Sequence, residues 1–76
     1  MDLAEQNLRK DVAKLKKGTV IRCFFTKGYP QGFLGEFSEL TDSGIILNNN
    51  GSFVPLGFLF MTRIMIYGLN KVILKE

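Results

Sequence analysis

Apolar and polar positions alternate most clearly in the stretch QGFLGEFSELTDSGIIL, residues 31–47. Phe33, Gly35 and Phe37 follow the two-residue period of a strand, whereas the next apolar residue, Leu40, comes three positions later. A three-residue step after a mid-strand glycine is typical of a β-bulge, because a strand bends easily where no Cβ is crowded. The stretch therefore predicts a long, strongly bent strand, a tight polar turn and a second strand.

The N-terminal segment predicts a helix over residues 2–17. Asp2, followed three residues later by Glu5, has the form of a capping box, and Gly18 can adopt the left-handed conformation that ends a helix. One side of the helix carries a narrow apolar stripe at helical spacing, formed by Ala4, Leu8, Val12 and Leu15. We expect this stripe to pack on the strands.

The rest of the chain predicts further short strands. They are Thr19–Thr26, Gly44–Asn48, Ser52–Leu56 and Arg63–Tyr67, with one helical turn over residues 58–62. Proline cannot donate to a strand ladder, so Pro55 places its strand at an edge or a bend. Residues 69–76 form either a sixth strand or an extension along the rim. The predicted fold is mainly β, a single domain over residues 1–76 with a five-stranded, strongly bent open barrel at residues 19–67.

Composition narrows the functional classes. The sequence has no histidine and one cysteine, Cys23, so it offers no nucleophile and base pair, no metal cluster and no internal disulfide. We therefore expect no catalytic residues, no metal, no cofactor and a cytoplasmic location. The uncharged run over residues 43–62 is interrupted by Pro55 and Gly57, and its apolar pieces are too short for a spanning helix, so no membrane partner is expected.

The net charge of +3 is concentrated near the N-terminus, where five of the ten basic residues lie: Arg9, Lys10, Lys14, Lys16 and Lys17. Such a cluster on a short helix is either a solvated face or a contact for the phosphates of RNA. Separately, an apolar content of 46% is high for so short a chain and indicates burial against other subunits.

The order of helix, bent strand, short turn and apolar strand resembles the Sm-like family, which includes LSm proteins and bacterial Hfq. Phe33–Leu40 matches the family's motif of apolar, any, glycine, any, apolar, two polar, apolar, and Ile45–Leu47 matches the apolar run that follows. The family's aspartate is replaced by Thr41, with Asp42 one place later. The resemblance covers Asp2 to about Tyr67 and implies a homo-oligomeric ring that binds single-stranded RNA.

The same resemblance implies positions for RNA at a pore. The turn after the bent strand holds Asp42 and Ser43 but neither an aromatic residue nor an asparagine. An alternative register makes Ile64–Tyr67 the fourth strand and residues 72–74 the fifth, which places Tyr67-Gly68-Leu69-Asn70 at the family's Arg-Gly element. The candidate pore residues are Asp42, Ser43, Arg63, Tyr67 and Asn70.

A ring requires an interface between subunits. The outer edges of Ser52–Leu56 and Arg63–Tyr67 are expected to lack partners within one chain, so pairing between neighbouring copies would close a pentamer to heptamer. The candidate interface side chains are Phe53, Phe58, Phe60, Ile64 and Ile66. The alternative function is a structural assembly ring, or a protein-interaction module, without nucleotide pockets.

Overall fold

The computed structural model describes residues 2–75, and over these residues the chain is mainly β. One helix, α1 (Leu3–Val12), precedes a single open sheet of six antiparallel strands in the order β4-β3-β2-β1-β5-β6. The strands are β1 (Val20–Phe25), β2 (Phe33–Leu40), β3 (Gly44–Asn49), β4 (Ser52–Gly57), β5 (Met61–Ile66) and β6 (Lys71–Leu74). The sequence predicted five barrel strands; Lys71–Leu74 adds a sixth, paired with β5.

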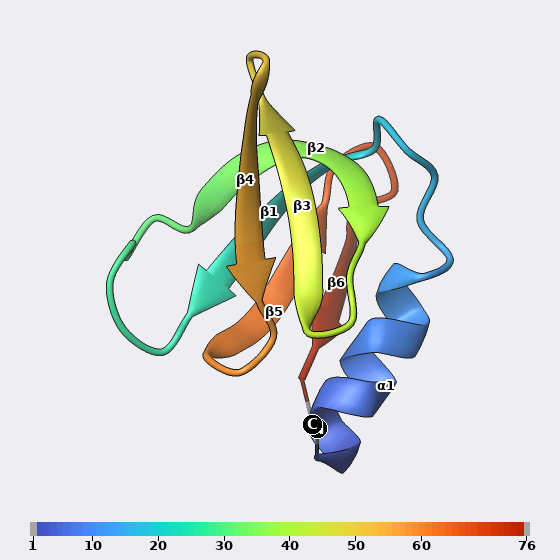
Figure 1. Ribbon diagram of the computed structural model, residues 1–76, viewed down its shortest axis with the longest axis vertical. Coiled ribbons are helices and arrows are strands. Elements are labelled where there is room, and N and C mark those ends of the chain that lie inside the picture. The colour runs from blue at the N-terminus through green and yellow to red at the C-terminus, as the bar shows by residue number, and fades with distance from the viewer. Residues whose placement is uncertain (1, 76) are drawn as a thin grey trace.

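The bend in β2 gives the sheet its shape. Pairing with β3 shifts register between Phe37 and Glu39, which confirms the predicted bulge. Figure 1 shows β2 curving strongly while β3 and β4 cross in front of β1 and β5. Gly35 is buried near this bend, and a Cβ there would lie only 3.1 Å from Leu47 Cβ. A residue without a side chain therefore lets β2 and β3 pack closely.

The core lies between the two halves of the bent sheet, and α1 covers one side of it. Leu8 and Val12 are fully buried, so the predicted apolar stripe does pack on the strands. Every strand except β4 supplies a buried hydrophobic residue to this cluster, and partly buried Leu56 of β4 packs against it. The strand members are Ile21, Cys23, Phe37, Ile45, Leu47, Met61, Ile64, Ile66 and Ile73.

The helix begins as predicted but ends earlier. Asp2 is its N-cap and accepts a 2.8 Å hydrogen bond from the backbone N–H of Glu5. After Val12 the backbone tightens into bonds of shorter range, including Leu15 N–H to Val12 O at 3.0 Å. The chain then turns back toward β1, and Gly18 N–H donates to Phe37 O at 2.8 Å. The helix expected over residues 2–17 is thus shorter, and its last three lysines lie in a loop.

The pairing of β6 with β5 corrects the expected subunit interface. Ile64 pairs with Ile73 and Met65 with Val72, so the outer edge of β5 is occupied within the same chain. Ile64 and Ile66 are buried in the core, as is Phe58. Their burial inside one chain, rather than between copies, explains much of the high apolar content. Of the candidate interface residues, Phe53 and Phe60 remain exposed, at 63% and 61%.

The turn between β4 and β5 is held in place by hydrogen bonds from the C-terminal segment. Lys75 Nζ donates to the carbonyl oxygens of Phe58 at 2.9 Å and Leu59 at 2.7 Å. Lys75 N–H also donates to Thr62 O at 3.0 Å. Residues 69–76 were expected to form a strand or a rim extension; within the described part, Lys71–Leu74 is the strand β6 and Lys75 after it fastens this turn. Within residues 2–75, no helix has the length and hydrophobicity needed to cross a membrane.

Cys23 is fully buried in β1, and burial raises the pKa of its thiol from the ordinary 9.0 to about 12. An unfolded chain would therefore ionise this thiol before the folded one does. The thiol's contribution to stability is fully present below about pH 9 and is lost as pH rises toward 12, by about 1.4 kcal/mol per pH unit.

We expect the difference in free energy of unfolding between the wild type and Cys23→Ala to shrink over this alkaline range. Urea denaturation at a series of pH values measures it. Every other ionisable group is common to both chains, so the comparison isolates the thiol. A difference that stays constant between pH 9 and 11 would contradict the raised pKa.

Candidate functional site

The outward-facing side of β1 and β5 combines cations with aromatic rings. Ile21 and Cys23 of β1 point into the core, as do Ile64 and Ile66 of β5. Side chains alternate along a strand, so their neighbours point outward. We call this outward set, with the residue that follows β5, the outer face: Val20, Arg22, Phe24, Arg63, Met65 and Tyr67.

Each arginine on the outer face contacts an aromatic ring. Phe24 pairs with Arg63 across the two strands, and the guanidinium carbon of Arg63 lies 4.1 Å from the ring centroid, a cation–π arrangement. Arg22 Nε donates to the hydroxyl oxygen of Tyr67 at 3.0 Å. The backbone N–H of Tyr67 donates to Val20 O, also at 3.0 Å. Tyr67 is therefore held through its hydroxyl and through its backbone, while 41% of the residue stays exposed.

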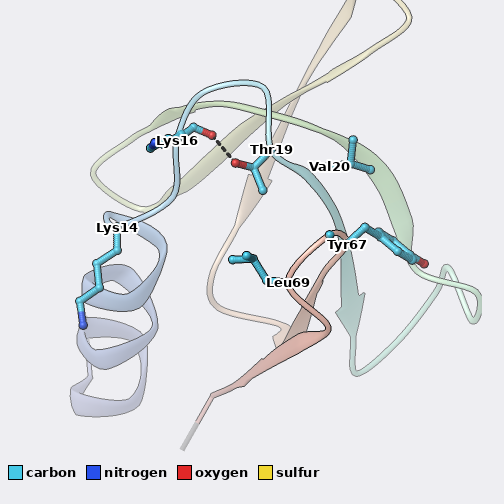
Figure 2. A pocket seen from close by; sticks show the side chains of 7 residues that line it. Lys14, Lys16, Thr19, Val20, Tyr67 and Leu69 are labelled. Carbon is cyan, nitrogen blue, oxygen red and sulfur yellow. Dashed lines mark hydrogen bonds between the residues drawn. The ribbon is translucent and has the colours of Figure 1, made fainter.

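A groove lies beside Tyr67, between the loop that follows α1 and the turn that joins β5 to β6. We call it the Tyr67 groove; its volume is about 640 Å³, and it is lined by Lys14, Lys16, Thr19, Val20, Tyr67, Gly68 and Leu69. In Figure 2, Leu69 reaches into the space between loop and turn, and the Tyr67 ring extends in the opposite direction, away from the two lysines. The Thr19 hydroxyl donates to Lys16 O at 2.6 Å, which fixes the loop wall.

The lining of the Tyr67 groove has a simple electrostatic character. Among the described residues it contains two lysines and no carboxylate, and its remaining side chains are mostly apolar. The nearest carboxylate in the ladder is that of Glu36, paired with Val20 at the neighbouring strand. Figure 2 shows the Tyr67 ring on one side of the groove and the two lysine side chains on the other, with Leu69 between them. An aromatic ring and cations along one apolar groove suit a ligand that carries both flat aromatic groups and negative charge, as a nucleotide chain does.

The five N-terminal cations lie in different parts of the structure. Lys14 and Lys16 line the Tyr67 groove, so two groups that the sequence analysis treated separately come together there. Arg9 instead ties α1 to the turn after β2, with Nε 3.3 Å from Thr41 O. Lys17 lines a different hollow, beside Glu36 and Phe53. Lys10 is exposed on α1.

The candidate pore residues do not gather at one place. Asp42 and Ser43 lie in the turn beside the start of β5, where Ser43 O accepts from Phe58 N–H at 2.9 Å. Tyr67 and Asn70 lie past the other end of β5, a separation of roughly 20 Å at strand rise. Arg63 sits between these ends, over Phe24. Within residues 2–75, a common site therefore forms around Tyr67 alone.

Sequence reasoning missed Arg22 and Phe24 as site residues. The signal was present in the period-two pattern of β1, where Val20, Arg22 and Phe24 share a face. It carried no functional meaning without the pairing of β1 with β5, which puts Arg22 and Tyr67, 45 positions apart in the sequence, in contact. Local periodicity does not show which distant strands pair.

Neither a metal cluster nor a known relative identifies the site among the described residues. Among the described residues, no three or more side chains of histidine, cysteine, aspartate or glutamate are close enough together to hold a metal ion. Comparisons with protein-family models, with curated proteins and with solved structures find no match for this chain. The functional argument therefore depends on the outer face and the Tyr67 groove themselves.

Proposed function

We propose that this chain is a small Sm-like β-barrel protein that binds single-stranded RNA, weakly and with modest sequence preference, at the Tyr67 groove. The observation that carries the proposal is the Tyr67 ring, which Arg22 holds over β1 beside a groove that includes Lys14 and Lys16. An aromatic ring that is fixed before binding loses little freedom when a base stacks on it. The sequence resemblance to the Sm-like family and the net charge of +3 give further support.

The Tyr67 ring and the lysine ammonium groups make different contributions to RNA binding. Every base has a π face, so stacking on Tyr67 tolerates many sequences and contributes about 1 to 3 kcal/mol per base. Lysine ammonium groups attract phosphates without reading the base, and this contribution falls as salt rises because bound counterions are released. The outer face offers few groups for reading base edges, so we expect low specificity.

The experiment is a fluorescence anisotropy titration of labelled oligouridine and oligoadenine of about ten nucleotides, at about 50 and 200 mM salt. We expect both to bind, with affinity falling steeply between the two salt concentrations. Tyr67→Ala should weaken binding about fivefold to a hundredfold, and Tyr67→Phe, which keeps the ring, should lose much less. Wild-type protein that binds neither oligonucleotide at low salt would overturn the proposal.

Two double variants with equal charge change test which cations matter. Lys14→Gln with Lys16→Gln removes the cations of the Tyr67 groove, whereas Lys10→Gln with Lys17→Gln removes two cations outside it. We expect only the first pair to reduce the slope of log affinity against log salt, by about one for each lost phosphate contact. Equal reductions would favour a general attraction to the basic N-terminal segment instead.

A second candidate function, an assembly module that binds other copies rather than RNA, is supported by the β4 edge. Within residues 2–75, β4 is an end strand of the sheet, and nothing pairs with its outer side. Phe53 on this strand and Phe60 after it are both exposed. Pro55 in β4 cannot donate to a ladder, so pairing between chains would use the other backbone groups of this edge, beside its exposed apolar side chains. Sedimentation at micromolar concentration tests this function, because a particle of 8.6 kDa is a single chain.

A further inference from the structure

The cross-strand pairing of β1 with β5 arranges the outer face in regular rows. On β1, Val20, Arg22 and Phe24 follow one another at two-residue spacing, so they point to the same side. Phe24 pairs with Arg63 of β5, and at the other end Val20 O accepts the backbone N–H of Tyr67 at 3.0 Å. Tyr67, Arg22 and Arg63 therefore lie on one face of the sheet, in three successive rows.

The Tyr67 ring points from the Tyr67 groove onto this face. It extends away from Lys14 and Lys16 in Figure 2, and its hydroxyl oxygen accepts from Arg22 Nε at 3.0 Å. Arg22 Nη1 also donates to Gln31 O at 2.7 Å. A guanidinium group has five N–H donors, so these two contacts leave others for a phosphate. A strand that stacks on Tyr67 thus meets a cation directly outside the groove.

The next polar group along the outer face is the guanidinium of Arg63. Its carbon lies 4.1 Å from the centroid of the Phe24 ring, and Arg63 is exposed. The ring therefore covers one side of the guanidinium and leaves the other side open to solvent. RNA bases stack on arginine guanidinium planes as they do on aromatic rings. The cation–π contact with Phe24 positions this plane before a base arrives.

The surroundings of these groups suit a ligand that is negative and partly apolar. The outer face contains two arginines and no carboxylate, and Glu36 lies at its margin, paired with Val20. Exposed apolar side chains flank it on the neighbouring strands: Leu34, Val72 and Leu74. This charge and the continuity with the Tyr67 groove indicate one occupant for both surfaces, a single strand of RNA.

We propose that the outer face continues the path of the RNA strand from the Tyr67 groove, with Arg22 binding a phosphate and the Arg63 guanidinium, on the Phe24 ring, stacking on a second base. This inference rests on the proposed function and adds the direction and length of the bound strand to it. Tyr67 and Arg63 are four positions apart, roughly 13 Å at strand rise. At a stacked rise of about 3.4 Å per nucleotide, the strand between them is about four nucleotides long.

NMR spectroscopy of the full, ¹⁵N-labelled chain tests the path without any substitution. Unlabelled oligouridine of about six nucleotides is long enough to reach from Tyr67 to Arg63. We expect it to shift the Nε–H signals of Arg22 and Arg63 and the backbone N–H signals of Phe24 and Tyr67 together, at the same RNA concentration. Shifts confined to Tyr67 and the Tyr67 groove would overturn the proposed path.

Substitution of Arg63 tests the stacking role, with the labelled ten-nucleotide oligouridine as the probe. We expect Arg63→Ala to weaken binding about fivefold or more and to lower the salt slope by about one. Arg63→Lys keeps the charge but not the planar group, so it should restore the slope and only part of the affinity. Lys10→Ala removes an equal charge from the exposed side of α1 and should bind like the wild type.

The outcomes separate the two proposals. If Tyr67→Ala weakens binding while both Arg63 variants bind like the wild type, the path is wrong and the proposed function stands. If Arg63→Lys restores the full affinity, Arg63 contacts a phosphate only and the second stacking position is wrong. If the wild type shows no salt-dependent binding, the proposed function fails and takes the path with it. Circular dichroism melting of the Arg63 variants verifies that each is folded.

Discussion

Replacing Gly44 by alanine is expected to remove a large share of the stability of the fold. Gly44 begins β3 opposite Gly57 of β4, and a Cβ placed on it would overlap the carbonyl oxygen of Leu56 and lie 2.8 Å from Gly57 Cα. The obstacle is backbone on a paired strand, so no side-chain rotation relieves it. We expect a loss of about 3 kcal/mol, a large share of the 5 to 15 kcal/mol that a folded domain typically has.

Thermal melting followed by circular dichroism measures this loss, at about 4 to 8 °C for each kcal/mol in a domain of this size. Gly57→Ala is the matched control on the partner strand, because the nearest atom to its added Cβ would be Ser43 O at 3.9 Å. We expect its melting temperature to change little. Equal melting temperatures for the wild type and Gly44→Ala would show that β3 and β4 are not paired as described.

Phe58→Ala is expected to cost about 3 to 5 kcal/mol, the range for truncating a large buried aromatic side chain. Phe58 is fully buried at the turn between β4 and β5, and its backbone is held by Ser43 and by Lys75. Its loss would leave a cavity in the core of a single chain. Chemical denaturation gives the free energy directly, with the midpoint shifted and the slope unchanged.

The control is Phe60→Ala, two positions along, where the side chain is exposed. Surface substitutions of this kind usually change stability by less than about 0.5 kcal/mol. The pair also distinguishes two interpretations of this apolar turn. If Phe58 served an interface between copies, its loss would change the size of the particle and leave the stability of the single chain alone. Comparable stability losses for the two variants would contradict the burial of Phe58.

Much of the fold could be predicted because it is encoded in local periods. The helix cap at Asp2, the strand spacing in β2 and the bulge after Phe37 all depend on residues within a few positions of each other. The sixth strand was harder to assign, because Lys71–Leu74 is short and only Ile73 is buried. Its role comes from pairing with β5, a property of the assembled sheet that four residues do not reveal.

The candidate site was only half predictable. Lys14, Lys16 and Tyr67 were each singled out from the sequence, yet for different reasons and at different supposed sites. The family resemblance directed attention to Asp42 and Ser43, which the fold places at the far end of β5 from Tyr67. Whether two segments meet depends on which strands pair, and the pairing of β1 with β5 spans most of the barrel sequence. Arg22 gains its position only through that pairing.

The pairing of β1 with β5 also has a consequence for the order in which the chain folds. The hairpins β2–β3 and β3–β4 join neighbours in sequence, whereas β1 meets β5 only after about 35 intervening residues have been placed. During synthesis at about 5 to 20 residues per second, Ile45 and Leu47 would emerge roughly a second or more before Ile64 and Ile66 can cover them. We therefore expect nascent chains to expose an apolar hairpin surface for that interval. Chaperones can bind this surface until β5 pairs with β1 and covers it.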